Sequence, residues 1–184
     1  KEKFTRKLEN ASNIDENTHC LKALFGDWND ALDGLGVTKK PGQEYGNGVS
    51  VMASLQLYKN LWELSEICKR YEKFKGKAEH YLKVREDLKQ GLLSNAIVKN
   101  NNDDKKILHG WGDDKSFFVG SFEDNDGYSR DSLIVNAYWI LSEFYKEAPE
   151  MLSFIKQAYV RLDSKYGFKT FEPYFPSSPK NSSK

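Results

Sequence analysis

Apolar residues recur at helical spacing in four stretches of the chain, and the first two form a pair. Residues 50–71 begin at Ser50, which can cap a helix, and their apolar positions fall on more than one side. Residues 75–96 combine an apolar face with a face of Lys, Arg, Glu and Asp, which is typical of an amphipathic helix. We therefore predict a buried helix followed by a more exposed one.

The same pair is repeated later in the chain. Residues 130–146 are mostly apolar and rich in aromatic side chains, and residues 149–164 are amphipathic, with Pro149 at a favoured first-turn position. Long segments rich in Gly and Asp, residues 20–49 and 107–129, precede the two apolar helices. This order predicts an all-α fold, part of an (α/α)6 double helical barrel with alternating inner and outer helices. A four-helix bundle is the alternative, but its connections would be shorter.

The polar segments define the expected domain organisation. Residues 1–19 are interpreted as a lead-in arm, residues 20–176 as a partial helical-barrel catalytic domain, and residues 177–184 as a flexible tail. The run KNNNDDKK, residues 99–106, is interpreted as a solvated turn. Part of a barrel would expose the apolar sides of its inner helices, so association into a homo-oligomer stays open.

Composition narrows the classes of partner and compartment. The chain has 28 Lys and Arg against 27 Asp and Glu, a net charge of +1, whereas nucleic-acid binding needs a basic face. No apolar run approaches the roughly 20 residues of a membrane span. Two cysteines, Cys20 and Cys68, do not make a disulfide framework in a domain of this length. We expect a cytoplasmic protein that binds neither nucleic acid nor membrane.

The sequence Gly-Asp-Trp-Asn-Asp-Ala-Leu-Asp at residues 26–33 places carboxylates, an amide and an indole in one short segment. Cleavage of a glycosidic bond needs a carboxylic acid that protonates the leaving oxygen, and an aromatic ring can hold the face of a sugar. A calcium-binding loop is the alternative, but it would need acids at alternate positions and a closing Glu. The segment therefore favours carbohydrate chemistry.

This segment resembles the GDWND motif of the cellobiose, chitobiose and cellodextrin phosphorylases and of the related cyclic β-1,2-glucan synthase domains. Three later segments resemble that family in the same order, GNGVSVMASLQLY, HGWGDDKSFFVGSFEDNDGYSRDSLIVNAYWILS and LDSKYGFKTFEPYF. The resemblance covers residues 20–176 and implies a helical barrel with an inverting mechanism. It implies that Asp30 is the general acid and that Trp28 and Asn29 line the sugar subsites, while Asp27 holds the turn.

The chain departs from the family in one segment. Where the phosphorylases commonly have GESVW, this sequence has Gly-Val-Ser-Val-Met at residues 48–52, so the acid and the aromatic residue of that segment are missing.

Phosphorolysis would need groups that hold inorganic phosphate, which is then the nucleophile. The candidates are His109, Arg130 and Lys115. Each also has a structural interpretation: His109 can pack beside Trp111, Arg130 can pair with an acid at the helix start, and Lys115 can be solvated.

Hydrolysis would instead need a second carboxylate, about 6.5–9.5 Å from the acid, that activates water. Glu123, Asp124 and Asp126 are candidates for this role. The same acids could bind sugar hydroxyls, and we expect Glu123 and Asp126 to bind substrate together with Trp111.

The leading hypothesis is an enzyme that carries out inverting phosphorolysis, or the reverse synthesis, of β-glycosidic bonds in di- or oligosaccharides. An inverting glycoside hydrolase on the same barrel is one alternative. A non-catalytic helical module that binds glycans or packs against a partner is the other. The expected partners are oligosaccharides or sugar 1-phosphates. No metal or cofactor is expected apart from inorganic phosphate as co-substrate, because the His and Cys residues lack zinc spacing.

Overall fold

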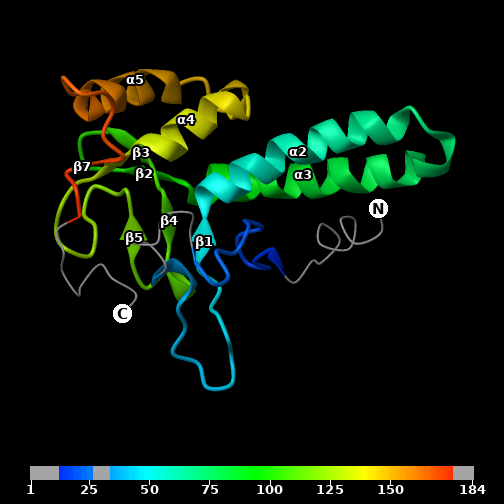
Figure 1. The fold of residues 1–184 in the computed structure, drawn as a ribbon, viewed down its shortest axis with the longest axis horizontal. Helices are drawn as coiled ribbons and strands as arrows, with labels where there is room; N and C mark the ends of the chain where they lie inside the picture. The colour runs from blue at the N-terminus through cyan, green and yellow to red at the C-terminus, as the bar shows by residue number, and fades with distance from the viewer. Residues whose placement is uncertain (1–12, 27–33, 176–184) are drawn as a thin grey trace.

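The computed structural model describes residues 13–26 and 34–175 (Figure 1). Within these residues the long elements are α-helices, and the strands are two or three residues long. The helices are α2 (Val51–Lys69), α3 (Lys75–Asn95), α4 (Leu133–Leu141) and α5 (Met151–Leu162).

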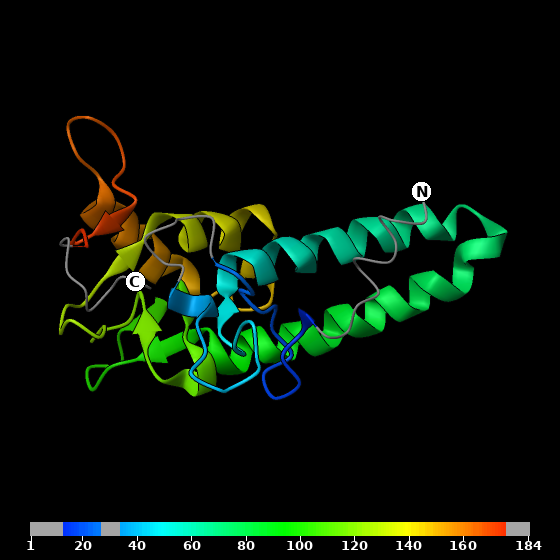
Figure 2. The same cartoon turned by 60° about the horizontal axis from the view of Figure 1, so that its bottom comes forward.

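Helices α2 and α3 form a long antiparallel hairpin that extends away from the rest of the molecule, as two views show (Figures 1 and 2). The short 3-10 turn η3 (Glu72–Phe74) joins them. Ser50 caps α2, because its hydroxyl accepts a hydrogen bond from Ala53 N at 3.4 Å, which confirms the predicted cap. Leu55 of α2 and Leu88 of α3 are fully buried and belong to the same core cluster.

Helix α4 is shorter than the predicted helix over residues 130–146. Asp131 and Ser132 form a strand instead, and the left-handed backbone of Glu143 (φ 63°) separates α4 from the 3-10 turn η5 (Phe144–Lys146). Helix α5 then presents one buried face to the core, whose residues recur at helical spacing, Met151, Ile155, Ala158 and Leu162. The prediction located this second helix pair but not the start and end of its first helix.

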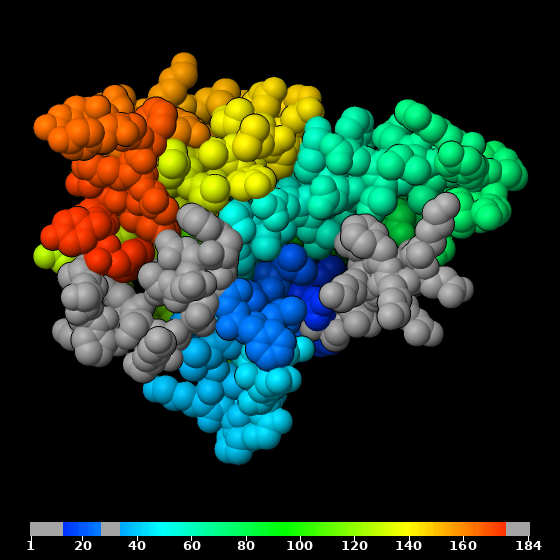
Figure 3. Space-filling view, viewed as in Figure 1, coloured from blue at the N-terminus to red at the C-terminus, as the bar shows by residue number. Residues whose placement is uncertain are grey.

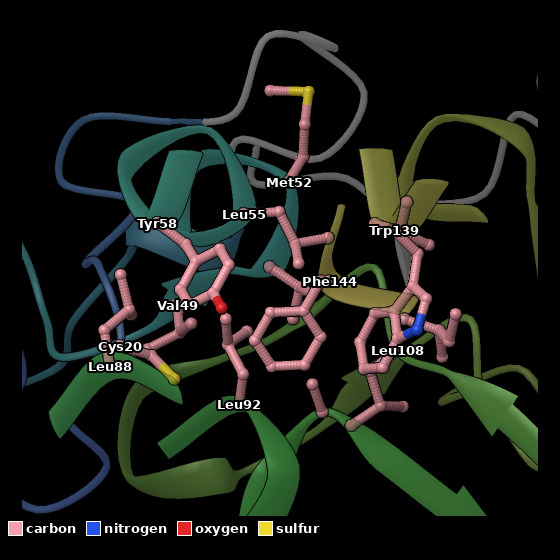
Figure 4. Packing of buried hydrophobic residues seen from close by; sticks show 14 of the residues in the cluster. Cys20, Val49, Met52, Leu55, Tyr58, Leu88, Leu92, Leu108, Trp139 and Phe144 are labelled. Atoms are coloured by element: carbon pink, nitrogen blue, oxygen red, sulfur yellow. The ribbon is translucent and has the colours of Figure 1, made fainter. Parts of the chain in front are cut away.

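Phe144 connects the two helix pairs in the hydrophobic core (Figure 4). Its ring packs edge-on against Tyr58 of α2, with ring centroids 4.9 Å apart, and against Trp139 of α4 at 4.6 Å. Aromatic pairs in this geometry contribute about 0.5–1.5 kcal/mol each beyond the burial of their surface. The core therefore lies between the base of the hairpin and the pair α4–α5.

In the described part of the chain, seven short strands pair into three small antiparallel sheets. The first has the order β1-β4-β5, the second joins β2 to β3, and the third joins β6 to β7. The strands are β1 (Val49–Ser50), β2 (Ile97–Lys99), β3 (Lys105–Ile107), β4 (Gly110–Trp111), β5 (Phe118–Val119), β6 (Asp131–Ser132) and β7 (Phe171–Glu172). Another 3-10 turn, η4 (Asp113–Lys115), lies between β4 and β5.

The predicted all-α class is therefore wrong. The structure is mixed, with 47% helix, 12% strand and three antiparallel sheets, and is not an all-α barrel. Of the segments rich in Gly and Asp, residues 20–49 end in the first residue of β1, and residues 107–129 contain β4 and β5. Strands of two or three residues are too short to show a period-2 pattern, so they cannot be recognised from hydrophobic periodicity.

The expected lead-in arm is only partly described, from residue 13 onward. Asp15 accepts hydrogen bonds from the backbone and hydroxyl of Thr18, and this turn lies against α3. A Cβ atom at Gly91 of α3 would stand 2.0 Å from the Thr18 carbonyl oxygen, so the contact requires glycine. The expected tail, residues 177–184, lies outside the described residues. No described helix combines the length and the apolar character that a membrane crossing demands.

Candidate functional site

The motif that carries the main functional prediction begins at Gly26. Asp27, Trp28, Asn29 and Asp30 lie outside the described residues, which resume at Gly34. The structure therefore describes the chain on both sides of the motif, and those two flanks are informative.

Both flanks of the motif are anchored at strand β1. Ala23 N donates to Gly48 O at 2.8 Å, directly before β1. On the other side, a Cβ atom at Gly36 would stand 1.8 Å from Leu24 O, and one at Gly48 would stand 1.7 Å from Leu35 O. These distances are too short for any side chain, so the backbones before and after the motif touch each other. The segment between them consequently begins and ends beside the strand that leads into α2.

His109 connects the starts of α2 and α4. Its side chain is fully buried, and its Nδ1 lies 2.9 Å from the hydroxyl of Ser132, the last residue of β6 before α4. Its backbone oxygen accepts a hydrogen bond from Val51 N, the first residue of α2, at 3.0 Å. The ring also packs against Phe171 of β7, with centroids 5.1 Å apart. The predicted phosphate ligand is thus a buried link between helix starts.

Arg130 is fully buried and completely hydrogen-bonded. Nη1 donates to Asp124 at 2.9 Å and to Asp126 at 3.0 Å, and Nη2 donates to Asp126 at 2.8 Å. Nε donates to Pro173 O at 2.8 Å, and Nη2 also reaches Tyr174 O at 3.4 Å. A guanidinium has five N–H donors, and these contacts engage all of them. Arg130 therefore has no donor left for a phosphate ion.

The acids around Arg130 differ in accessibility. Asp124 is buried and also accepts from the backbone and hydroxyl of Ser121, both at 2.7 Å. Asp126 holds Arg130 through both carboxylate oxygens. Glu123 is exposed, and no contact of its carboxylate is seen among the described residues. Of the three candidate bases, Glu123 is the one that the Arg130 cluster leaves accessible.

The remaining predicted residues lie beside each other on β4 and η4. Trp111 is 1% exposed and belongs to the core, so its indole offers no face to solvent. Lys115 is exposed, donates to Asn95 Oδ1 at 2.7 Å, and lies 5.7 Å from the Trp111 ring centroid. The structure thus groups Trp111 with Lys115 and Arg130 with Asp126, in two separate places.

A third cluster, Lys106, Asp131 and Arg161, was not predicted from the sequence. Lys106, interpreted as part of a solvated turn, has a side chain only 8% exposed. Its Nζ lies 3.2 Å from Asp131 and donates to Arg130 O at 3.0 Å, while Arg161 of α5 binds Asp131 through Nε at 2.5 Å. Burial lowers the pKa of Lys106, and the nearby Asp131 carboxylate offsets part of that effect. The three residues are far apart in sequence, so the polar run 99–106 does not indicate that Lys106 is buried against Asp131.

Comparisons with known proteins leave the site without an assigned family. The chain matches no protein-family model and no curated protein. In the described part of the chain, no group of three or more His, Cys, Asp and Glu residues could hold a metal ion.

Proposed function

We propose that this chain is part of a carbohydrate-active enzyme that breaks or forms β-glycosidic bonds with inversion, with Asp30 as the general acid. The observation that supports the proposal most is the anchoring of the motif at both flanks. Gly36 packs on Leu24, and Gly48 O accepts from Ala23 N, so the described flanks of the motif meet beside β1. A catalytic acid needs a fixed position relative to the bond that it protonates, and a short segment with anchored ends provides this.

Phosphorolysis is the leading reaction, and it needs a donor group that phosphate can reach. Arg130 is saturated by Asp124 and Asp126, and Lys115 lies out on η4 against Asn95. His109 is fully buried and links the starts of α2 and α4, so the exposed Lys115 is the one of the three predicted ligands that phosphate could reach.

An inverting hydrolase is the second candidate because of one specific contact pattern. Asp124 and Asp126 are neutralised by Arg130, whereas Glu123 is exposed. Activation of water requires an accessible carboxylate that no cation neutralises.

The test is an assay of the protein with β-linked disaccharides, with and without inorganic phosphate. Phosphorolysis predicts a sugar 1-phosphate that forms only when phosphate is present, and hydrolysis predicts free sugar in both cases. We expect Asp30→Asn to lower turnover by about 10²- to 10⁴-fold, the usual contribution of a general acid. Asp33→Asn, in the same segment, is the matched control and should keep most of the activity.

Circular dichroism and urea unfolding of both variants separate loss of chemistry from loss of fold. An Asp30→Asn protein that turns over like the wild type would refute the role of Asp30. The absence of any glycosidic activity across the substrate panel in the folded wild-type protein would refute the enzymatic proposal.

A further inference from the structure

A cavity of about 570 Å³ opens on the far side of β6 from His109. Successive residues of a strand point to opposite faces, so Ser132 points to His109 while Asp131 points the other way, to Lys106 and Arg161. The cavity lies between β3, α5 and β7, and Figure 3 shows α5 next to the segment that carries β7. Its volume is within the usual 300–1,000 Å³ of small-molecule sites.

The base of this cavity is a fixed charged group with unused donors. Asp131 is 5% exposed and is held by Arg161 through Nε at 2.5 Å and Nη2 at 3.1 Å. Lys106 has three N–H donors, of which Arg130 O and Asp131 take two. The third donor of Lys106 and the Nη1 donors of Arg161 make no hydrogen bond to any described residue, and both side chains line the cavity.

The charges that line the cavity balance. Three cations, Lys105, Lys106 and Arg161, face three carboxylates, Asp104, Asp131 and Glu172. A site for phosphate or a polyanion would show an excess of positive charge. This balance favours a neutral ligand that accepts and donates several hydrogen bonds.

Uncharged groups complete the lining. Phe122 and Phe154 supply aromatic surface, and Gln157 of α5 supplies an amide that makes no hydrogen bond to any described residue. The Phe122 ring lies 5.4 Å from Lys106 Nζ, so an apolar face and a free donor are adjacent. Ligand sites combine apolar surface with a few fixed polar groups in this way.

We propose that this cavity binds a neutral oligosaccharide, as a second sugar site separate from the segment of Asp30. The choice of a sugar among neutral polar ligands rests on the proposed function. The hydrogen-bonding groups would be Lys106, Arg161 and Gln157, and the aromatic surface would be that of Phe122 and Phe154.

The experiment is a calorimetric titration of the whole chain with β-linked glucose oligosaccharides of several lengths, and separately with inorganic phosphate. Gln157→Leu and Arg161→Met should each raise the Kd roughly three- to tenfold, which is the loss of one or two hydrogen bonds. Lys156→Leu is the matched control on α5, because Lys156 is exposed and does not line the cavity. This control should leave the Kd unchanged.

The variants also separate the two proposals. Asp30→Asn should lose turnover and keep the oligosaccharide affinity of the cavity. If the folded wild-type protein binds oligosaccharides but turns none of them over, the proposed function is refuted and the cavity site is not. The site is refuted if oligosaccharides do not bind, if binding ignores both Gln157→Leu and Arg161→Met, or if phosphate binds instead.

Discussion

Arg130 and Lys106 are buried cations joined by one hydrogen bond, yet their surroundings differ. Arg130 is enclosed by Asp124, Asp126 and two backbone carbonyls, and every N–H is engaged. Lys106 shares the carboxylate of Asp131 with Arg161, and it faces a cavity with an unused donor. A saturated cation is part of the framework, whereas a cation with a free donor at a cavity is available to a ligand.

The sequence could not show this contrast between Arg130 and Lys106. Arg130 is a phosphate candidate in the sequence because phosphate needs cationic donors, and the alternative was that it pairs with a nearby acid. In the structure two acids close to it in sequence, Asp124 and Asp126, saturate it. Here, the acids that lie close to Arg130 in sequence are paired with it inside the protein and do not leave it available to a ligand. Lys106, in a run that looked solvated, is held by a residue 25 positions later in the chain.

The largest expected effect is the loss of the saturated cation. Arg130→Met leaves the buried carboxylates Asp124 and Asp126 without their partner, and such changes cost about 3–5 kcal/mol. Urea unfolding measures the loss, and Arg70→Met, at an exposed residue, is the control that should change stability by less than about 0.5 kcal/mol. A loss for Arg130→Met as small as that of the control would show that the cluster does not stabilise the fold.

A smaller effect that depends on pH is expected at Lys106. Lys106→Met leaves Asp131 paired with Arg161 and removes a buried ammonium, so the loss near neutral pH should be about 1 kcal/mol or less. The pKa of Lys106 is lower when folded than its ordinary 10.5, chiefly through burial. Between these two values the unfolded chain binds more protons, so the wild type gains stability as the pH rises toward 10.5.

The measurement for Lys106 is the difference in free energy of unfolding between wild type and Lys106→Met at several alkaline pH values. It should shift in favour of the wild type as the pH rises. A difference that shifts the other way would mean that Asp131 outweighs burial and raises the pKa of Lys106.

The smallest effect is expected where the charges are exposed. Glu143 contacts Lys146 and also Lys59 at 3.0 Å, and these lysines lower its pKa to about 2. The stabilisation from these pairs is present above the ordinary pKa of 4.5 and is lost as the pH falls toward 2. Thermal unfolding of wild type and Glu143→Gln across this range should converge at the acid end, and a constant difference would contradict the assignment.

The helices of the hairpin could be predicted closely because their signals are local. The predicted helix over residues 50–71 is α2 (Val51–Lys69), and the one over 75–96 is α3 (Lys75–Asn95). Their apolar spacing repeats over many turns, and Ser50 marks the start of α2 by its own hydroxyl. Periodicity sustained over this length needs no knowledge of the partner that it packs against.

The strands could not be predicted because their signals are distant. Asp131 and Ser132, which directly precede α4, pair with Glu172 and Phe171, so they form a strand through a partner 39 to 41 residues later in the chain. The core contacts of Phe144 with Tyr58 and Trp139 likewise depend on tertiary packing. The same holds for the candidate site. Its two flanks come together through close backbone contacts at Gly36 and Gly48, and no local sequence pattern specifies these contacts.

The pairing register of strand β6 determines the positions of two residue clusters, the one around His109 and the one around Lys106 and Arg161. Its pairing with β7 fixes which way each of its two residues faces, Ser132 to the histidine and Asp131 to the cavity. Deleting one residue just upstream would move Ser132 into the position of Asp131 and Leu133 into the position of Ser132. The cavity side would then receive a hydroxyl in place of a carboxylate, and the histidine side would receive an apolar side chain. Both clusters would fail together, and a change of length here is therefore more disruptive than any single substitution within either one.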